Sequence, residues 1–361
     1  MRITRALVIV GCLLGAAILF GWATRVERAE LRWSAADLDP LPEPQANGWA
    51  LLAEIEQVPQ LPADLAEWVG MASSIDAVST WKMRPTDEAA ISAFLRQPEV
   101  AEILRAWHAA AKRPHFVDGC ALDFDSFCPD FRLYQIHQVV AIEVLDHLVR
   151  GNWEAAADVT VEMLEVSARY SSSARTMLGA ATSIASHGLA LGLFDVVDYA
   201  SPPFKNVPWY AREKLDTLEH HASVDPDLRL AVVGEYIRIA DMLRRMTAGE
   251  VDPADHDTRL PRWLFDRDRT VHRINAVFDD YLACAEGRSL STSSSSDAPT
   301  GTLTDRLLNP VGEQLLALLV PSVFLEQCKR HHEQVTKTRE RRSEIIERLS
   351  SPRQHPSERV R

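Results

Sequence analysis

Apolar residues recur every three to four positions along most of this chain, which is the spacing of an amphipathic helix. No alternating polar and apolar stretch of strand length interrupts the pattern. The sequence therefore predicts an all-α protein, in which an N-terminal transmembrane helix is followed by a multi-helix array or bundle with αα-hairpins. The helical stretches begin at 48–52 and continue at 63–80, 86–111, 131–149, 153–171, 175–199, 208–222, 226–248, 268–286 and 303–350.

The clearest unit of the pattern is an αα-hairpin over residues 131–171. Leu133, Ile136 and Val140 repeat at helical spacing on one face of its first helix. The sequence Arg150-Gly151-Asn152 supplies a tight turn, and the returning helix begins directly after it.

An unbroken uncharged run of eighteen residues occupies positions 6–23. As a helix it would span about 27 Å, close to the hydrocarbon thickness of a bilayer. We therefore predict a basic leader at 1–5 and a transmembrane anchor at 6–24. Two alternatives stay open, namely a signal peptide cleaved after Ala23 and a lipoprotein modified at Cys12.

The charges beside this run set its direction only weakly, because Arg residues flank it on both sides. A short basic leader in front of a single span is nevertheless typical of a chain whose bulk is exported. The expected location is the bacterial inner membrane, crossed once, with the bulk of the chain periplasmic or extracytoplasmic. Residues 6–24 are then the part that contacts the membrane.

A second uncharged run covers residues 176–194 and raises the question of a second span. It includes Thr182, Ser183, Ser186 and His187, so it is less hydrophobic than the first run. Small residues within it would let neighbouring helices approach closely. A buried central helix of a bundle is favoured over a span.

Composition divides the remainder of the chain into segments. Proline punctuates a spacer at 33–46, and a helical domain at 47–286 follows it. Serine dominates a flexible linker at 287–302. The chain then continues as a C-terminal helical segment at 303–350 and a basic tail at 351–361 that is expected to be disordered.

The net charge is −12, and it is unevenly distributed. Residues 1–32 carry five Arg against two Glu, and residues 329–361 carry ten Lys or Arg against five Glu, so the middle is strongly acidic. Such a body repels nucleic acid phosphates. No nucleic-acid partner is expected, whereas a protein partner in the envelope is compatible with this charge.

Four cysteines lie outside the apolar run, which is an even number that an oxidising compartment allows to pair. Cys120 and Cys128 flank a loop-like sequence and form the first predicted disulfide. Cys284 and Cys328 form the second, across the Ser-rich stretch. Three pairings are compatible with the sequence, and four unpaired thiols are the alternative.

Candidate catalytic residues are few. Ser79 and Lys82 fit the S-x-x-K pattern of penicillin-recognising enzymes, but the S-D-N-like and K-T-G motifs that such enzymes require do not occur in the chain. A helix end is the favoured interpretation of this pattern. An enzyme is therefore not the preferred class, and no cofactor is predicted.

Candidate metal ligands are equally sparse. Glu143 and His147 share one helical face, and His272 and Asp279 lie two turns apart. Di-metal bundles need Glu-x-x-His repeated on two helices, and that motif is absent from the chain. We predict no metal site, and we expect His187 to be a neutral core histidine bonded to a serine or a backbone carbonyl.

The order of these segments resembles a loosely defined group of uncharacterised, envelope-anchored, all-helical bacterial proteins. The resemblance covers most of the chain in short pieces. It implies an exported helical domain and brings no known activity. Beyond the basic leader and anchor, the matching pieces are Asn47-Gly48-Trp49-Ala50-Leu51-Leu52, Gly151-Asn152-Trp153, Asp268-Arg269-Thr270-Val271-His272 and Leu308-Asn309-Pro310-Val311-Gly312.

Three classes of function follow from this sequence. The preferred one is a membrane-anchored helical interaction or scaffold protein of the bacterial envelope. The alternatives are an envelope enzyme with an unrecognised site and a small-molecule or lipid binder that uses the central helices near 176–194.

Overall fold

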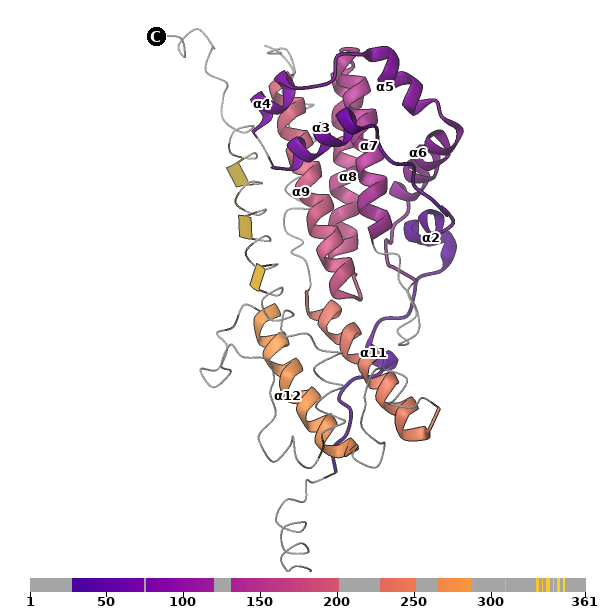
Figure 1. The fold of residues 1–361 in the computed structure, drawn as a ribbon, viewed down its shortest axis with the longest axis vertical. Helices are drawn as coiled ribbons and strands as arrows, with labels where there is room; N and C mark the ends of the chain where they lie inside the picture. Colours follow the sequence, from indigo (N-terminus) through magenta and orange to yellow (C-terminus); the bar gives the residue numbers. More distant parts are fainter. Residues whose placement is uncertain are drawn as a thin grey trace, which may run out of the picture. The chain divides into compact units, whose positions relative to one another are not determined.

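The computed structural model describes residues 28–119 except 75, residues 131–200, 228–250 and 265–286, and single positions beyond these. The regular elements of this part are helical, and its only β-type pairing is an isolated parallel bridge between Asn47 and His115. The predicted all-α class is therefore confirmed for this part of the chain (Figure 1). The predicted anchor at 6–24 lies outside the described residues.

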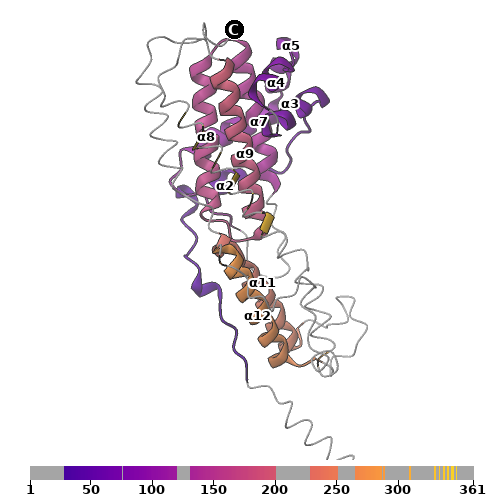
Figure 2. The same ribbon diagram turned by 90° about the vertical axis from the view of Figure 1, so that its left-hand side faces the viewer.

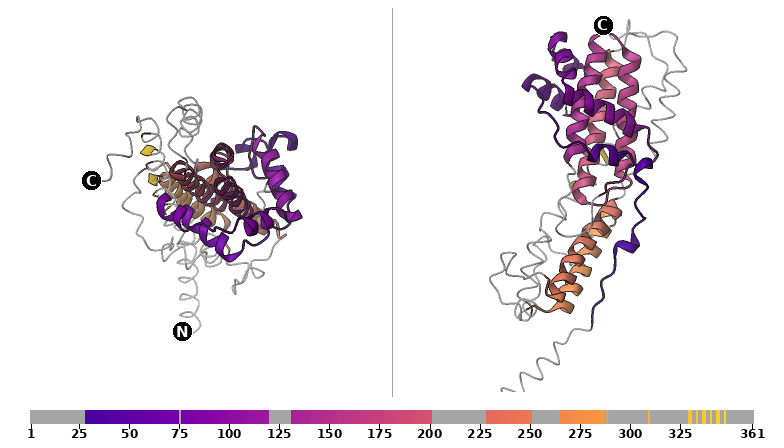
Figure 3. Two further views of the ribbon diagram at one scale, coloured as in Figure 1. Left: turned by 90° about the horizontal axis from the view of Figure 1, so that it is seen from above. Right: turned by 90° about the vertical axis from the view of Figure 1, so that its right-hand side faces the viewer.

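Three long helices form the main bundle. They are α7 (Phe131–Val149), α8 (Trp153–Ser171) and α9 (Met177–Ala200). All three pairs among them are in contact, and the helices run side by side in Figures 2 and 3. The bounds of α7 and α8 are those predicted from the periodicity, so the αα-hairpin is confirmed.

The turn between α7 and α8 closes as a Schellman motif. Gly151 adopts φ 73°, and the N–H groups of Gly151 and Asn152 donate to the carbonyls of Leu148 and His147, at 3.1 and 2.8 Å. A side chain at this φ would be strained, which explains why glycine occupies the corner.

Shorter helices cover the bundle. Helices α3 (Ala63–Ser74) and α4 (Ala77–Lys82) contact α9, while α5 (Glu88–Leu95) contacts α7 and α6 (Pro98–Ala111) contacts both α7 and α8. Helix α2 (Gly48–Ala53) lies against α6.

Two of the predicted helical stretches are each divided into two helices. The stretch 63–80 is split into α3 and α4, and the Asp76 carboxylate starts α4 by accepting the Ser79 N–H at 2.9 Å. The stretch 86–111 is split into α5 and α6 because Pro98, at the start of α6, has no N–H to continue the preceding helix. Apolar spacing persists across both breaks, so periodicity alone does not reveal them.

Helix α9 is the one described helix that is long and apolar enough to cross a membrane by its length and composition. In the bundle, 72% of its most apolar window is buried, and α3, α4, α7 and α8 all contact it. Its surroundings are those of a central bundle helix, the interpretation favoured for residues 176–194.

The chain divides into two compact units, and helices α11 (Leu228–Ala248) and α12 (Arg267–Ala285) each cross the division. The smaller unit comprises Met1–Arg32, Met242–Asp279 and Ser294–Ser322. The larger unit comprises Trp33–Asp241, Asp280–Ser293 and Val323–Arg361, and it contains the α2–α9 bundle.

Within residues 33–46, predicted as a spacer, two side chains pack against α11, while most of the others are exposed. The segment includes two short 3-10 turns, η1 (Ala35–Asp37) and η2 (Pro44–Ala46). Leu38 packs with Val233 and Ile237 of α11. The Trp33 ring meets Tyr236 edge-on, with ring centroids 4.7 Å apart. Trp33 and Leu38 thus give a proline-rich sequence enough apolar surface to dock.

The predicted linker at 287–302 and the tail at 351–361 lie outside the described residues, apart from Arg288. Within the predicted C-terminal segment 303–350, the described positions between 329 and 347 are helical.

Candidate functional site

A charged cluster within the bundle centres on His108 of α6. Its Nδ1 lies 2.8 Å from the Glu162 carboxylate of α8, and its Nε2 lies 3.1 and 3.2 Å from the two oxygens of Glu143 on α7. One imidazole thus joins three helices. Its side chain is about one-third exposed, so the cluster lies at the edge of the bundle.

These two carboxylates determine the charge of the imidazole. Hydrogen bonds that the ring donates to Glu143 and Glu162 raise the pKa of His108 to about 10, despite an opposing effect of burial. At neutral pH the ring is therefore a cation with both N–H groups engaged. A general base needs a free nitrogen and a pKa near the working pH, and His108 offers neither. The cluster therefore has a structural role, because it joins α6 to α7 and α8.

The same geometry argues against a metal ion at this cluster, because the two carboxylates face opposite nitrogens of one ring. Among the described residues, no group of three or more His, Cys, Asp or Glu side chains is arranged to hold a metal ion. Glu143 and His147, the same-face pair weighed as candidate ligands, are not bonded to one another. Glu143 is bonded to His108, and His147 Nδ1 is buried without a hydrogen-bond partner.

A second polar cluster lies inside the bundle around His137 of α7. The ring is fully buried and meets Trp107 of α6 edge-on, with centroids 4.7 Å apart. Burial, assisted by the neighbouring His187, lowers the pKa of His137 to about 3, against a smaller opposing effect of the Ser186 backbone. His137 is therefore neutral across the physiological range.

His187 is bonded as predicted for a core histidine. Its Nδ1 lies 3.3 Å from the hydroxyl oxygen of Ser167 on α8. Sequence reasoning found His187 because it stands in an uncharged run, and it missed His137. A signal was available, since His137 lies four residues after Leu133 and three before Val140, within the apolar face of its helix.

Carboxylates also gather at the first turn of α9. Asp118 accepts the Tyr170 hydroxyl at 3.3 Å and the Arg175 N–H at 3.4 Å, and Glu235 accepts the Met177 N–H at 3.2 Å. Burial raises the pKa of Glu235. Negative side chains at a helix N-terminus satisfy its unpaired N–H groups, so these contacts position α9.

The motif 47–49 fixes the start of the helical domain. The Asn47 amide donates to the Val117 carbonyl at 2.7 Å, and its oxygen accepts the N–H groups of Val117 and Trp49 at 3.0 and 3.2 Å. Trp49 then stacks on Tyr170, with ring centroids 5.2 Å apart. The motif joins three distant segments and has a structural role.

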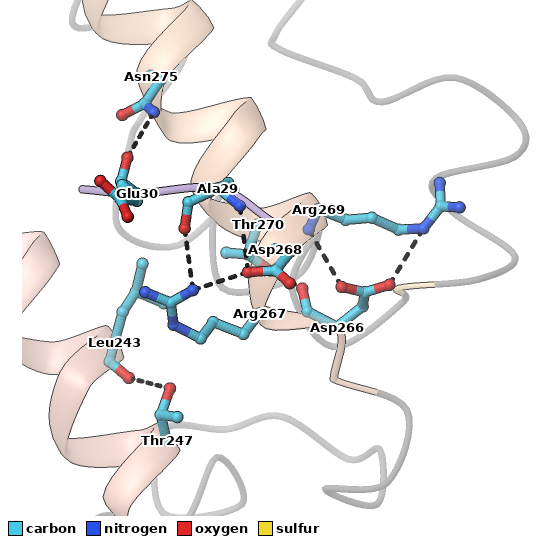
Figure 4. Close-up of polar contacts among 10 residues, drawn as sticks. All are labelled: Ala29, Glu30, Leu243, Thr247, Asp266, Arg267, Asp268, Arg269, Thr270 and Asn275. Carbon is cyan, nitrogen blue, oxygen red and sulfur yellow. Dashed lines mark hydrogen bonds and ion pairs between the residues drawn. The ribbon is translucent and has the colours of Figure 1, made fainter. Parts of the chain in front are cut away.

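A network of polar contacts in the smaller unit binds residues 29–32 to α12 (Figure 4). Asp268 accepts the Ala29 N–H at 3.4 Å, Arg267 donates to the Ala29 carbonyl at 3.0 Å, and Asn275 donates to the Glu30 carbonyl at 3.1 Å. Arg32 forms an ion pair with Asp279. The segment is held at successive turns of one helix.

Asn309 forms hydrogen bonds with two residues at the start of α12 in the same unit. Its side-chain oxygen accepts the Asp266 N–H and its amide donates to the Thr270 hydroxyl, both at 2.8 Å. Asn309 is fully buried. Two pieces of the resemblance, 268–272 and 308–312, are therefore in direct contact through Asn309 and Thr270.

The other candidate residues from the sequence do not come together in one site within the described part of the chain. Ser79 and Lys82 lie in the six-residue helix α4, where Ser79 completes the Asp76 cap. Asp279 is paired with Arg32, and His272 is exposed. Cys284 is buried on α12, while Cys120, Cys128 and Cys328 lie outside the described residues, so both disulfides stay predictions.

Comparisons with known proteins add no assignment: no family model, curated protein or solved structure matches this chain.

Proposed function

We propose that this protein is an interaction scaffold of the bacterial envelope, anchored in the inner membrane through residues 6–24, with its helical domain on the extracytoplasmic side. The docking of residues 29–32 on α12 supports the proposal most directly. These residues begin only five positions after the proposed anchor. An anchor followed at once by a bound segment would leave α12 little freedom to move away from the membrane.

The polar contacts of the described bundle also favour a scaffold over an enzyme. His108 uses both of its ring nitrogens to hold α7 and α8. Asn47 and Asp118 likewise use their side chains to join helices and connecting segments. The polar groups of such a bundle make it rigid. A rigid surface suits a scaffold that binds other proteins.

Photo-crosslinking in the native envelope would test the scaffold. A benzophenone amino acid would replace Met83 or Tyr199 in the full chain, because both side chains are about half exposed. We expect discrete crosslinked protein bands that recur between preparations. Absence of reproducible bands from both positions would contradict the scaffold proposal.

A matched control would separate anchoring from partner binding. The double variant Leu14→Arg and Ile18→Arg places two charges in the proposed span, each costing roughly 2.5–3.5 kcal/mol at the centre of a membrane helix. We expect this variant to leave the membrane fraction and to lose its crosslinks. Crosslinks that persist in the soluble fraction would support partner binding without the anchor.

Topology needs its own experiment. A reporter that is active only in the cytoplasm, fused after Arg361, should be inactive if the domain is exported. The cysteines give an independent readout: in an oxidising compartment, the proposed Cys120–Cys128 and Cys284–Cys328 disulfides would protect four thiols from alkylation in denaturant until a reductant is added. Reporter activity together with full alkylation would reject an extracytoplasmic location.

A further inference from the structure

Several buried polar atoms in one part of the bundle have no hydrogen-bond partner within the protein. They are the indole nitrogen of Trp107, the hydroxyl oxygens of Thr182 and Ser186, and the ring nitrogens of His137, which lie near the Ser186 backbone without the geometry of a full hydrogen bond. His137 and Trp107 are in ring contact, and the backbone of Ser186 interacts with His137. Thr182 lies one helical turn from Ser186 on α9.

The two hydroxyls are exceptions within this molecule. Buried hydroxyls on its helices generally donate to a backbone carbonyl three or four residues earlier, as Thr160 does to Ala156 at 2.7 Å. Ser167 and Ser183 do the same, at 2.7 and 2.8 Å. Helical geometry offers Thr182 and Ser186 the same option, and neither takes it.

Leaving such atoms unpaired is expensive. Each buried donor or acceptor without a partner carries the full penalty of its lost hydration, and native proteins contain only a few of them. These five atoms lie on α6, α7 and α9, linked by the His137–Trp107 ring contact and by the Ser186 backbone beside His137. A group that bonds to several of them at once would remove most of that cost.

We propose that His137, Trp107, Thr182 and Ser186 form an internal binding site for a small uncharged guest that both donates and accepts hydrogen bonds. Water is the smallest molecule of this class, and a small hydroxyl- or carbonyl-bearing organic compound has the same chemistry. The site is independent of membrane anchoring and of the scaffold function.

The side chains define what the guest must offer. The indole N–H of Trp107 can only donate, so the guest needs an acceptor atom. A neutral imidazole presents one donor and one acceptor, and each hydroxyl can act as either. No carboxylate, lysine or arginine belongs to this set, so nothing in it would balance the charge of an ion.

Isosteric removal of the hydroxyls gives a test with opposite expected signs. If a guest is bonded to them, Thr182→Val and Ser186→Ala should each raise the unfolding equilibrium constant of the full chain about 3- to 10-fold, because a satisfied buried hydrogen bond is lost. If the hydroxyls are truly unpaired, the same variants should lower that constant. The readout is denaturant unfolding followed by circular dichroism.

Matched controls come from hydroxyls that bond within their own helix. Thr160→Val and Ser183→Ala remove buried hydroxyls of known partners, Ala156 and Ala180. They report the cost of losing a hydroxyl that bonds its own backbone. A larger loss of stability at Thr182 and Ser186 than at these controls is the expected result.

Two measurements on the full chain identify the guest. They also test whether the internal site is occupied if a variant fails to fold. Water held in the site should appear as long-lived water in oxygen-17 relaxation dispersion of the wild type, and the signal should persist in Ser183→Ala. An organic guest should appear as added mass in native mass spectrometry and be released on unfolding. No long-lived water, no added mass and no loss of stability would overturn the proposal.

Discussion

At the scale of single residues, chemistry in this protein is decided by contacts that are distant in sequence. Helical spacing pairs Glu143 with His147, yet Glu143 bonds to His108, 35 residues earlier. Glu162, the other partner of His108, is 54 residues away. Helix periodicity predicts neighbours within one helix only, so no local signal connects these three side chains. The role of His108 emerges from the packing of α6 against α7 and α8.

Replacing His108 should weaken the bundle at neutral pH. His108→Gln removes a cation that pairs two carboxylates, and it leaves Glu143 and Glu162 partly buried without their partner. We expect a loss of roughly 1–3 kcal/mol in the free energy of unfolding, the range for hydrogen bonds to charged groups. Urea unfolding at pH 7 measures it. His115→Gln, at an exposed position of the larger unit, is the control and should change stability by less than about 0.5 kcal/mol.

The pH dependence of this effect has a defined sign. The folded pKa of His108 is about 10 against an ordinary value of 6.5, so the folded state holds an extra proton between these limits. Its stabilisation is complete below about pH 6.5 and is lost as the pH rises through 10. The stability difference between wild type and His108→Gln should therefore shrink from pH 7 to pH 10. A difference that grows with pH would contradict the assignment.

Gly48 provides a second residue-scale prediction. A Cβ at this position would lie 2.5 Å from the Ala110 carbonyl and 2.7 Å from the Phe116 ring. Gly48→Ala should therefore destabilise the protein by about 1–3 kcal/mol through overpacking. A Cβ at Gly70, within α3, would meet nothing within 4 Å, so Gly70→Ala should stabilise the helix by about 0.5–1 kcal/mol. Thermal unfolding of both variants tests the opposite signs.

At the scale of elements, the sequence predicts the position of helices better than their breaks. Periodicity locates α7 and α8 to the residue, because a glycine-containing corner ends the first helix and starts the second. It merges α5 with α6 and α3 with α4, where apolar spacing continues across the boundary. Pro98 and the capping residue Asp76 are the available signals. Where no glycine marks the end of a helix, a proline or a capping residue is a better guide to the boundary than apolar periodicity.

The connection between elements at Asn47 yields a further prediction. Asn47→Ala deletes three hydrogen bonds, one buried and two partly buried ones to Val117, and leaves backbone groups of both segments unpaired. We expect a loss of roughly 2–4 kcal/mol in the free energy of unfolding. Asn152 precedes α8 without a side-chain cap bond, so Asn152→Ala is the matched control and should cost less than about 0.5 kcal/mol. Equal effects in the two variants would exclude the proposed role of Asn47.

At the scale of the whole molecule, apolar content alone does not distinguish core from membrane. Helix α9 passes the length and composition test for a span, yet it is largely enclosed by the bundle. Its hydroxyls and His187 are the residues that favour a core helix in the sequence, and they line or adjoin the proposed internal site. The association of 29–32 with α12 was not predictable, because Ala29 and Glu30 contribute backbone atoms and carry no side-chain signal.

The division into two compact units predicts stepwise loss of structure. Among the described residues, the larger unit contains α7–α9 and most of the buried apolar side chains, whereas the smaller unit buries fewer of them and also uses polar contacts such as those of Asn309. Native-state hydrogen exchange in rising urea should therefore show residues 267–279 of α12 losing protection before α7–α9.

Asn309→Ala should sharpen this order. The variant unpairs the Asp266 N–H and the Thr270 hydroxyl, so protection in 267–279 should fall by about ten-fold or more, while protection in α7–α9 stays within about two-fold of wild type. His108→Gln should produce the reverse pattern, because its contacts lie wholly within the larger unit. If both variants lower protection equally in all helices, the two units unfold as one cooperative body, and Asn309 stabilises the whole chain instead of one part of it.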